Sequence, residues 1–292
     1  MQQFTAIGVG EVLWDVLPDG KKLGGAPANF AYHINALGGI GIPVSRIGDD
    51  ELGREALAIL NDHHVSTDHI SVDAEHPTGT VDAAIDAAGV ATYTFPDDVA
   101  WDFLSFDKST HELVAGADAV CFGTLAQRSS VSQAAIHSVL GAASRSLKIY
   151  DINLRQDFYT QDRIATSMTV ADVLKINDDE LALVSEMFAL PGDEKTALQA
   201  LLVQYDLTLA VLTRGGDGSL ILSKNDISDL SGQPTEVVDT IGAGDSFTAA
   251  MTLAYLHGQS LNEINRYATR VASYVCGQAG AMPAMPDELR VG

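Results

Sequence analysis

Strand-like and helix-like runs alternate along most of the chain, and this alternation limits the possible folds more than any other feature. Six apolar runs have the length expected of β-strands: residues 4–13, 119–123, 148–152, 173–176, 207–213 and 219–222. Six other runs carry apolar residues at helical spacing: 28–37, 51–61, 131–144, 179–188, 245–257 and 261–277. This order predicts an α/β fold with a mostly parallel sheet covered by helices on both faces. No repeat or clear linker interrupts the 292 residues, so we expect one domain over 1–292.

Residues 78–101 depart from the alternation. The strand-like pairs Thr80-Val81 and Tyr93-Thr94 follow one another with no helical run between them. We expect a small antiparallel piece that stands off the main sheet, and inserts of this kind often act as lids over a site. An ordinary edge hairpin is the alternative.

Composition excludes several classes of function. The net charge of −22 argues against nucleic acid and against anionic membrane surfaces, both of which attract clustered Lys and Arg. No apolar stretch reaches 18 residues, and the first ten residues lack the features of a signal peptide. Cys121 and Cys276 lie far apart in apolar runs, which favours buried free thiols in a reducing cytoplasm over a disulfide.

The segment 239–245, DTIGAGD, joins two carboxylates through a turn of small residues. Apolar residues then recur at helical spacing: Phe247, Ala250, Met251 and Ala254. Backbone N–H groups of a glycine-rich turn at a helix N-terminus bind anions. We interpret Asp245 as a group that takes a proton beside a phosphate. A tight loop with Asp245 as a partner of the helix dipole is the alternative.

Polar groups suited to a small ligand occur near the N-terminus. Gly8-Val9-Gly10-Glu11 ends the first predicted strand, but no dinucleotide fingerprint is completed there. Adjacent glycines in 24–29, GGAPAN, allow a ligand to approach the backbone closely. Asp15 and Asn29 offer the acceptors and donors that a polyol needs. Taken singly, each could instead serve a turn or a helix start.

Three further segments follow predicted strands, where ligands gather in parallel sheets. In 151–155, DINLR, Arg155 suits a phosphate or a surface ion pair. In 177–180, NDDE, the oxygen ligands suit hydrated Mg²⁺, although Asp178 and Asp179 fit better as residues that start a helix. The glycine-rich 213–218, TRGGDG, suits either a nucleotide or a plain hairpin turn.

These motifs, in this order, resemble those of the ribokinase/PfkB family of ATP-dependent sugar kinases along essentially the whole chain. The resemblance rests on GGAPAN (24–29), N-x-x-E (177–180), T-x-G-x-x-G (213–218) and D-T-x-G-A-G-D (239–245). Within the family, G-E-x-L-x-D (10–15), D-x-N-x-R (151–155) and GAPANF (25–30) are most similar to bacterial fructokinases. The resemblance implies a three-layer ribokinase-like sandwich with a small β lid formed by about 12–24 and 78–105.

The resemblance also implies roles for single residues in phosphoryl transfer. Asp245 would be the general base, and an anion hole would be formed by the N–H groups of Gly242, Ala243 and Gly244. The sugar would be held by Asp15, Gly25, Asn29 and Arg155 and covered by Phe95 and Trp101.

Nucleotide and metal sites follow in the same way. The nucleotide would be bound by Asn177, Thr213, Gly215, Gly218 and Cys276. Asn177 and Glu180 would position Mg²⁺, mostly through water. Asp239 and Ile241, with the segment 275–280, would hold a monovalent cation such as K⁺. Thr269 falls where related kinases often carry an Asn near the adenine.

The function implied is transfer of the γ-phosphoryl group of ATP to fructose, giving fructose 6-phosphate, in the cytoplasm. The alternatives are a kinase for ribose, 2-keto-3-deoxygluconate or a nucleoside, and a sugar- or nucleotide-binding regulator without catalysis. The resemblance also implies a homodimer through the lid, with sugar and ATP as the small-molecule partners.

Overall fold

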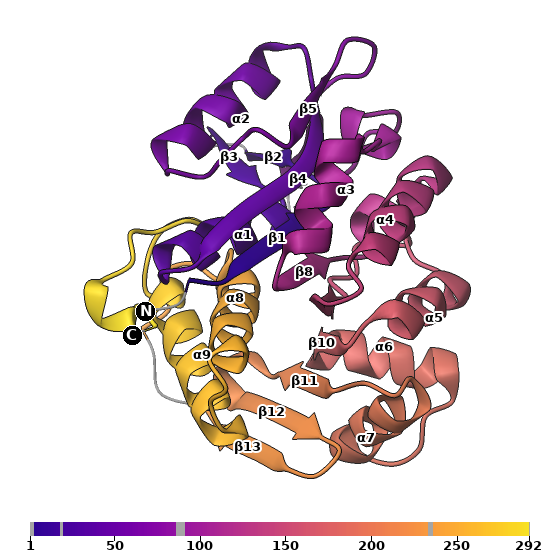
Figure 1. Ribbon diagram of the computed structural model, residues 1–292, viewed down its shortest axis with the longest axis vertical. Helices are drawn as coiled ribbons and strands as arrows, with labels where there is room; N and C mark the ends of the chain where they lie inside the picture. The colour runs from indigo at the N-terminus through magenta and orange to yellow at the C-terminus, as the bar shows by residue number, and fades with distance from the viewer. Residues whose placement is uncertain (1–2, 18–19, 86–90, 233–235, 292) are drawn as a thin grey trace.

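A nine-stranded sheet runs through the molecule (Figure 1). The structure is a computed structural model and describes residues 3–17, 20–85, 91–232 and 236–291. Its strands lie in the order β13 (Ile227–Ser231), β12 (Gly218–Ser223), β11 (Leu209–Thr213), β10 (Val173–Asn177), β9 (Leu147–Asp151), β8 (Ala119–Phe122), β1 (Thr5–Val9), β4 (Ile40–Gly48) and β5 (Ile70–Asp73). Neighbouring strands from β5 to β11 are parallel, whereas β12 and β13 are antiparallel. The predicted mostly parallel sheet is confirmed.

Helices cover both faces of this sheet. One face packs on α1 (Ala26–Ala36), α8 (Ala243–Leu256) and α9 (Leu261–Cys276), and the other on α3 (Lys108–Gly116), α4 (Ser130–Ala142), α5 (Gln161–Val170), α6 (Asp178–Phe188) and α7 (Glu194–Gln204). In β8, Val120 and Phe122 face one core while Ala119 and Cys121 face the other, because successive side chains of a strand alternate. The three-layer α/β architecture is confirmed.

The remaining elements complete the chain. The helix α2 (Glu51–Asp62) packs its buried residues with those of α1 and β4. Short 3₁₀ helices are η1 (Ala100–Phe103), η2 (Leu125–Arg128), η3 (Gly215–Asp217) and η4 (Asp287–Leu289). Among the described residues, none of the helices has the length and apolar character needed to cross a membrane.

A second, four-stranded sheet stands off the first. Its order is β3 (Gly20–Gly24), β2 (Leu13–Leu17), β6 (Gly79–Ile85) and β7 (Ala91–Thr94). The β6–β7 hairpin is antiparallel, which confirms the small antiparallel piece predicted over residues 78–101. The central pair β2–β6 is parallel, because β2 and β6 continue from β1 and β5, which end at the same edge of the main sheet and point the same way.

The predicted strand over 4–13 is two strands that belong to different sheets. The chain bends between β1 and β2 at Gly10, whose φ is +149°. A Cβ atom on Gly10 would lie 2.9 Å from Cγ of Pro27 in α1. The bend therefore lets α1 start close against the end of β1, where polar residues of both segments meet.

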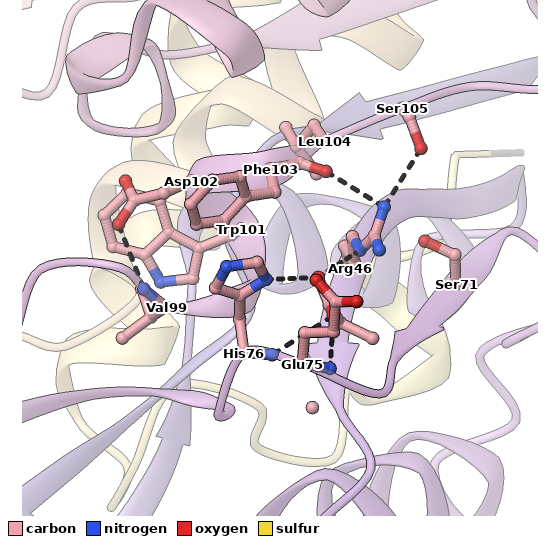
Figure 2. Close-up of polar contacts among 12 residues, drawn as sticks. Arg46, Ser71, Glu75, His76, Val99, Trp101, Asp102, Phe103, Leu104 and Ser105 are labelled. Carbon is pink, nitrogen blue, oxygen red and sulfur yellow. Dashed lines mark hydrogen bonds and ion pairs between the residues drawn. The ribbon is translucent and has the colours of Figure 1, made fainter.

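The base of the second sheet is fixed by a buried carboxylate. Asp73, at the end of β5, accepts hydrogen bonds from the backbone N–H groups of Glu75 and His76 and forms an ion pair with Arg46 at 2.8 Å. Figure 2 shows the His76 ring beside Phe103 of η1; their ring centroids are 3.7 Å apart. Arg46 also donates to the carbonyl of Phe103 and to Ser105. These contacts tie the β5–β6 connection to the segment that follows β7.

Candidate active site

A cleft with a volume of about 1090 Å³ lies between the two sheets. Its walls come from the residues that follow β1, β9, β10 and β11, from the second sheet, and from the starts of α1 and α8. The carboxyl ends of parallel strands are where α/β proteins gather their ligands. Most of the residues singled out in the sequence line this cleft: Asp15, Gly25, Asn29, Phe95, Arg155, Asn177, Thr213, Gly215, Gly218, Ile241, Gly242, Ala243, Gly244, Asp245 and Cys276.

The start of α8 forms the centre of the cleft. Gly242 precedes the helix with φ +78°, and a Cβ atom there would lie 2.6 Å from the carbonyl oxygen of Ala281. The N–H of Ala243 donates to the carbonyl of Thr240 over a long 3.3 Å, while those of Gly242 and Gly244 have no backbone partner in the described part of the chain. Within the described residues, no side chain caps the helix. Unpaired N–H groups at a helix start suit an anionic ligand.

Asp245 is a buried carboxylate held in a fixed orientation in the first turn of α8. Its Oδ2 accepts a hydrogen bond of 2.7 Å from Nδ2 of Asn29 in α1. Burial and the nearby charge of Asp151 raise the pKa of Asp245, Asn29, Lys175 and Arg155 oppose the rise, and the resulting pKa is about 6. At neutral pH the carboxylate is therefore mostly ionised, with a pKa close to that of an efficient general base.

A buried ion pair lies next to the start of α8. Nζ of Lys175, in β10, lies 3.0 Å from Oδ1 of Asp151 at the end of β9. The other oxygen of Asp151 accepts from the hydroxyl of Thr248, which also donates to the carbonyl of Gly244. Lys175 lines the cleft, and sequence reasoning did not single it out. The sequence feature that could have identified it is a lysine inside the apolar run VLKIN, because a charged side chain in a buried strand needs a partner.

The end of the cleft near α1 carries the residues assigned to a sugar. Burial raises the pKa of Asp15, while Arg155 and Lys22 oppose the rise. Gly25 has φ +110° and lies so close to Glu11 that a Cβ atom would be 2.5 Å from the carbonyl oxygen of that residue. Oδ1 of Asn29 is buried and has no hydrogen-bond partner among the described residues.

The two aromatic residues expected over the sugar are placed differently. Phe95 lines the cleft and meets Phe158 edge to face. Trp101 is only 1% exposed and does not line the cleft, because Gly79 lies against its Nε1 and the guanidinium of Arg128 covers its ring at 4.0 Å. The prediction that Trp101 closes over the sugar is therefore wrong, and the residue belongs to the core beneath the second sheet.

The opposite end of the cleft carries the residues assigned to a nucleotide. The stretch from Thr213 to Gly218 is the turn between β11 and β12, as the hairpin alternative predicted, and it also lines the cleft. Thr269 lines the cleft from α9 and shares a 2.9 Å hydrogen bond with Ser219. Cys121 and Cys276 are both free, which confirms the predicted thiols. Cys121 is buried as predicted, but Cys276 is partly exposed at the cleft wall.

The residues assigned to Mg²⁺ form a helix cap. The side chain of Asn177 accepts from the N–H of Glu180 at 2.8 Å, and Oε2 of Glu180 accepts from the N–H of Asn177 at 2.9 Å. Oε1 of Glu180 accepts from the N–H of Leu154. Glu180 thus lies behind the cleft wall with both oxygens engaged. The exposed carboxylates on the wall are Asp178 and Asp179, which begin α6 as preferred from the sequence. The described residues contain no cluster of three or more metal-binding side chains.

Asp239, assigned to a monovalent cation, links three segments. Its carboxylate accepts from the N–H groups of Ile241 and Gly280, each at 3.1 Å, and forms an ion pair with Lys22 at 3.3 Å. Partial burial raises its pKa, but these three contacts outweigh that effect and leave the pKa below its ordinary value. Ile241 lines the cleft, whereas Asp239 lies behind it. The structure thus brings Asp239 and the segment 275–280 together and adds a lysine of β3 to them.

Comparison with known proteins agrees with this arrangement. The family model described as pfkB family carbohydrate kinase matches residues 15–288. The chain is 28% identical to a fructokinase of Klebsiella pneumoniae over 97% of both chains, and 28% identical to a probable fructokinase-3 of Arabidopsis thaliana over 92% of this chain and 81% of that one.

Solved structures share the fold. A fructokinase from Xylella fastidiosa with bound ATP superposes with a TM-score of 0.85 at 22% identity, covering 97% of this chain and 95% of that one. A 2-dehydro-3-deoxygluconokinase from Thermotoga maritima superposes with a TM-score of 0.84 at 18% identity, covering 99% and 97%. With a family model matched across nearly its whole length and a cleft built from that family's motifs, the chain belongs to the pfkB family of carbohydrate kinases.

Proposed function

We propose that this kinase transfers the γ-phosphoryl group of ATP to fructose, giving fructose 6-phosphate. The observation that carries the proposal is the position of Asp245. It is a buried carboxylate, oriented by Asn29 at 2.7 Å, in the same turn as the N–H groups of Gly242 and Gly244, which have no backbone partner among the described residues. A base and an anion site side by side are what transfer to a hydroxyl group requires.

The residues then divide the work of the reaction. A sugar hydroxyl donates its hydrogen bond to Asp245, which takes the proton as the hydroxyl oxygen attacks the γ-phosphorus of ATP. The bond from that phosphorus to the β–γ bridging oxygen breaks, and ADP leaves. The N–H groups of Gly242 and Gly244 face the negative charge on the transferring group, and Lys175 adds a positive charge beside Gly244. Positioning and charge stabilisation supply most of the catalysis in phosphoryl transfer.

A divalent metal fits this cleft through the nucleotide rather than through a protein cage. Mg²⁺ keeps several waters and takes one or two carboxylates together with phosphate oxygens. Asp178 and Asp179 are the exposed carboxylates on the wall near Asn177, and these would hold the hydrated ion. When bound, the ion would neutralise charge on the phosphates. A structural neighbour from E. coli contains ATP and Mg²⁺, and one from Vibrio cholerae contains fructose, ADP and calcium.

Fructose is favoured over other sugars because the curated relatives reported above are named fructokinases. The rival is another substrate of the same reaction, since the fold is shared by kinases of 2-dehydro-3-deoxygluconate and of aminoimidazole riboside. The second sheet would act as a lid, with Phe95 on its cleft side, and would pair two copies of the chain. We place the enzyme in the cytoplasm.

The test is ADP release measured with fructose, ribose, 2-keto-3-deoxygluconate and a nucleoside, each with K⁺ and with Na⁺. We expect the highest kcat/KM for fructose. From the family resemblance we also expect faster ADP release in K⁺ than in Na⁺. A higher kcat/KM for another sugar would replace the substrate. No ADP release with any of them would support the regulator and reject the kinase.

A further inference from the structure

Glu11 is a buried carboxylate in the cleft wall that none of the roles above uses. It follows the bend at Gly10, lines the cleft and is 3% exposed. The backbone N–H groups of Glu11 itself and of Ala26, the first residue of α1, lower the pKa of this carboxylate. Gly25 at the N-cap has no side chain, so the carboxylate of Glu11 lies at the start of α1 where a capping side chain would otherwise be.

One oxygen of this carboxylate is left without a partner. Oε2 of Glu11 is buried and accepts no hydrogen bond from the described residues. Oδ1 of Asn29, in the first turn of α1, is in the same condition. Leaving a buried acceptor unsatisfied costs free energy, so native proteins rarely retain such atoms unless water or a ligand pairs with them. Two such acceptors at one end of a ligand cleft point to a ligand that brings hydrogen-bond donors.

We propose that Glu11 is a substrate-binding residue whose Oε2 accepts a hydrogen bond from a sugar hydroxyl other than the one that is phosphorylated. The inference rests on the proposed function, because it requires a polyol in the cleft. It assigns Glu11 to substrate recognition and leaves proton transfer to Asp245. A carboxylate suits this contact because each of its oxygens can accept hydrogen bonds, and Oε2 has no partner among the described residues.

The charge state of Glu11 makes this contact sensitive to pH. Burial, and to a smaller extent the charge of Asp245, raise its pKa, the two backbone N–H groups and Arg155 oppose the rise, and the resulting pKa is about 7. A hydroxyl donor stabilises the ionised form, so sugar binds best above this pKa and more weakly below it. We expect sugar affinity to fall as the pH drops below about 7.

The experiment compares wild type, Glu11→Gln, Glu11→Ala and the control Glu263→Gln. Glu263 caps a helix, α9, but it is exposed and lies outside the cleft wall. The variants are assayed for sugar and ATP kinetics with the preferred sugar and its monodeoxy derivatives. Losing a hydrogen bond to a charged group predicts a sugar KM about 10- to 100-fold higher in Glu11→Ala, with the KM for ATP changed less than about 3-fold. Glu11→Gln, which keeps a side-chain acceptor, should lose the pH dependence near 7.

Deoxy sugars identify the hydroxyl itself. The derivative that lacks the contacted hydroxyl should bind weakly to wild type but suffer little further loss in Glu11→Ala, because both changes remove the same bond. Unchanged sugar KM in a folded Glu11→Gln variant, or equal losses for sugar and ATP, would overturn the inference and leave Glu11 as a structural residue at the start of α1. If Glu11→Ala does not fold, Glu11→Gln decides. If the wild type phosphorylates no sugar, the proposed function and this inference are both rejected. If the wild type is active but substitution of Glu11 leaves the sugar KM unchanged, only the inference is rejected.

Discussion

Asp245→Asn should make the protein more stable while removing its activity. The pKa of Asp245 rises from its ordinary 3.8 to about 6 in the folded chain, chiefly through burial. One pKa unit is worth about 1.4 kcal/mol, so the ionised carboxylate lowers the free energy of unfolding at pH 8 by about 3 kcal/mol. Asn resembles the protonated acid in shape and has no charge to desolvate.

The sign of the pH dependence follows from the proton balance. Between pH 4 and 6 the folded protein holds a proton on Asp245 that the unfolded chain has released, so wild-type stability falls as the pH rises through this range. The advantage of Asp245→Asn should therefore be near zero at pH 4 and reach about 3 kcal/mol above pH 7. Turnover should fall by about 10²-fold or more, the usual contribution of a general base.

Urea unfolding at pH 4, 6 and 8, combined with ADP release at saturating sugar, measures both effects. The matched control is Asp62→Asn, an exposed carboxylate of α2 that should change neither stability nor rate by much. Equal stability of Asp245→Asn and wild type at pH 8 would refute the burial argument. Wild-type turnover in Asp245→Asn would refute the role of the base.

Three other changes probe the cleft. Gly242→Ala should reduce kcat and stability, because its Cβ would lie 2.6 Å from the carbonyl oxygen of Ala281. Urea unfolding and ADP-release kinetics measure the two effects, and no change in either would contradict the need for glycine at this position. Phe95→Ala should raise the KM for sugar and increase ATP hydrolysis without sugar, as water enters the cleft; unchanged values of both would reject a covering role. Lys175→Met should destabilise the fold by about 3–5 kcal/mol, because it leaves the buried carboxylate of Asp151 without its ion-pair partner. The double variant with Asp151→Asn should regain stability but not kcat, and recovery of both would mean that the ion pair is purely structural.

Much of the site was predictable because its residues lie in short, contiguous motifs. The turn 239–245 needs glycine for a positive φ and places Asp245 in a helix's first turn, and both properties are local. Asp178 and Asp179 were correctly placed at a helix start for the same reason. Trp101 was misplaced because aromatic residues in an insert can face either the ligand or the core, and here Gly79 and Arg128 provide a core pocket.

The sequence by itself determined the layered α/β fold, since periodicity of apolar residues decides which face of each element is buried. It also determined the Asp245 turn, since backbone conformation there depends on nearby glycines. Only the tertiary structure decided which residues meet across the cleft. Asn29 and Asp245 are separated by 216 positions yet lie 2.7 Å apart, because α1 and α8 pack on the same face of the sheet. The unpartnered oxygen of Glu11 and the buried pair of Lys175 with Asp151 depend on strands from separate parts of the chain, so no local pattern could reveal them.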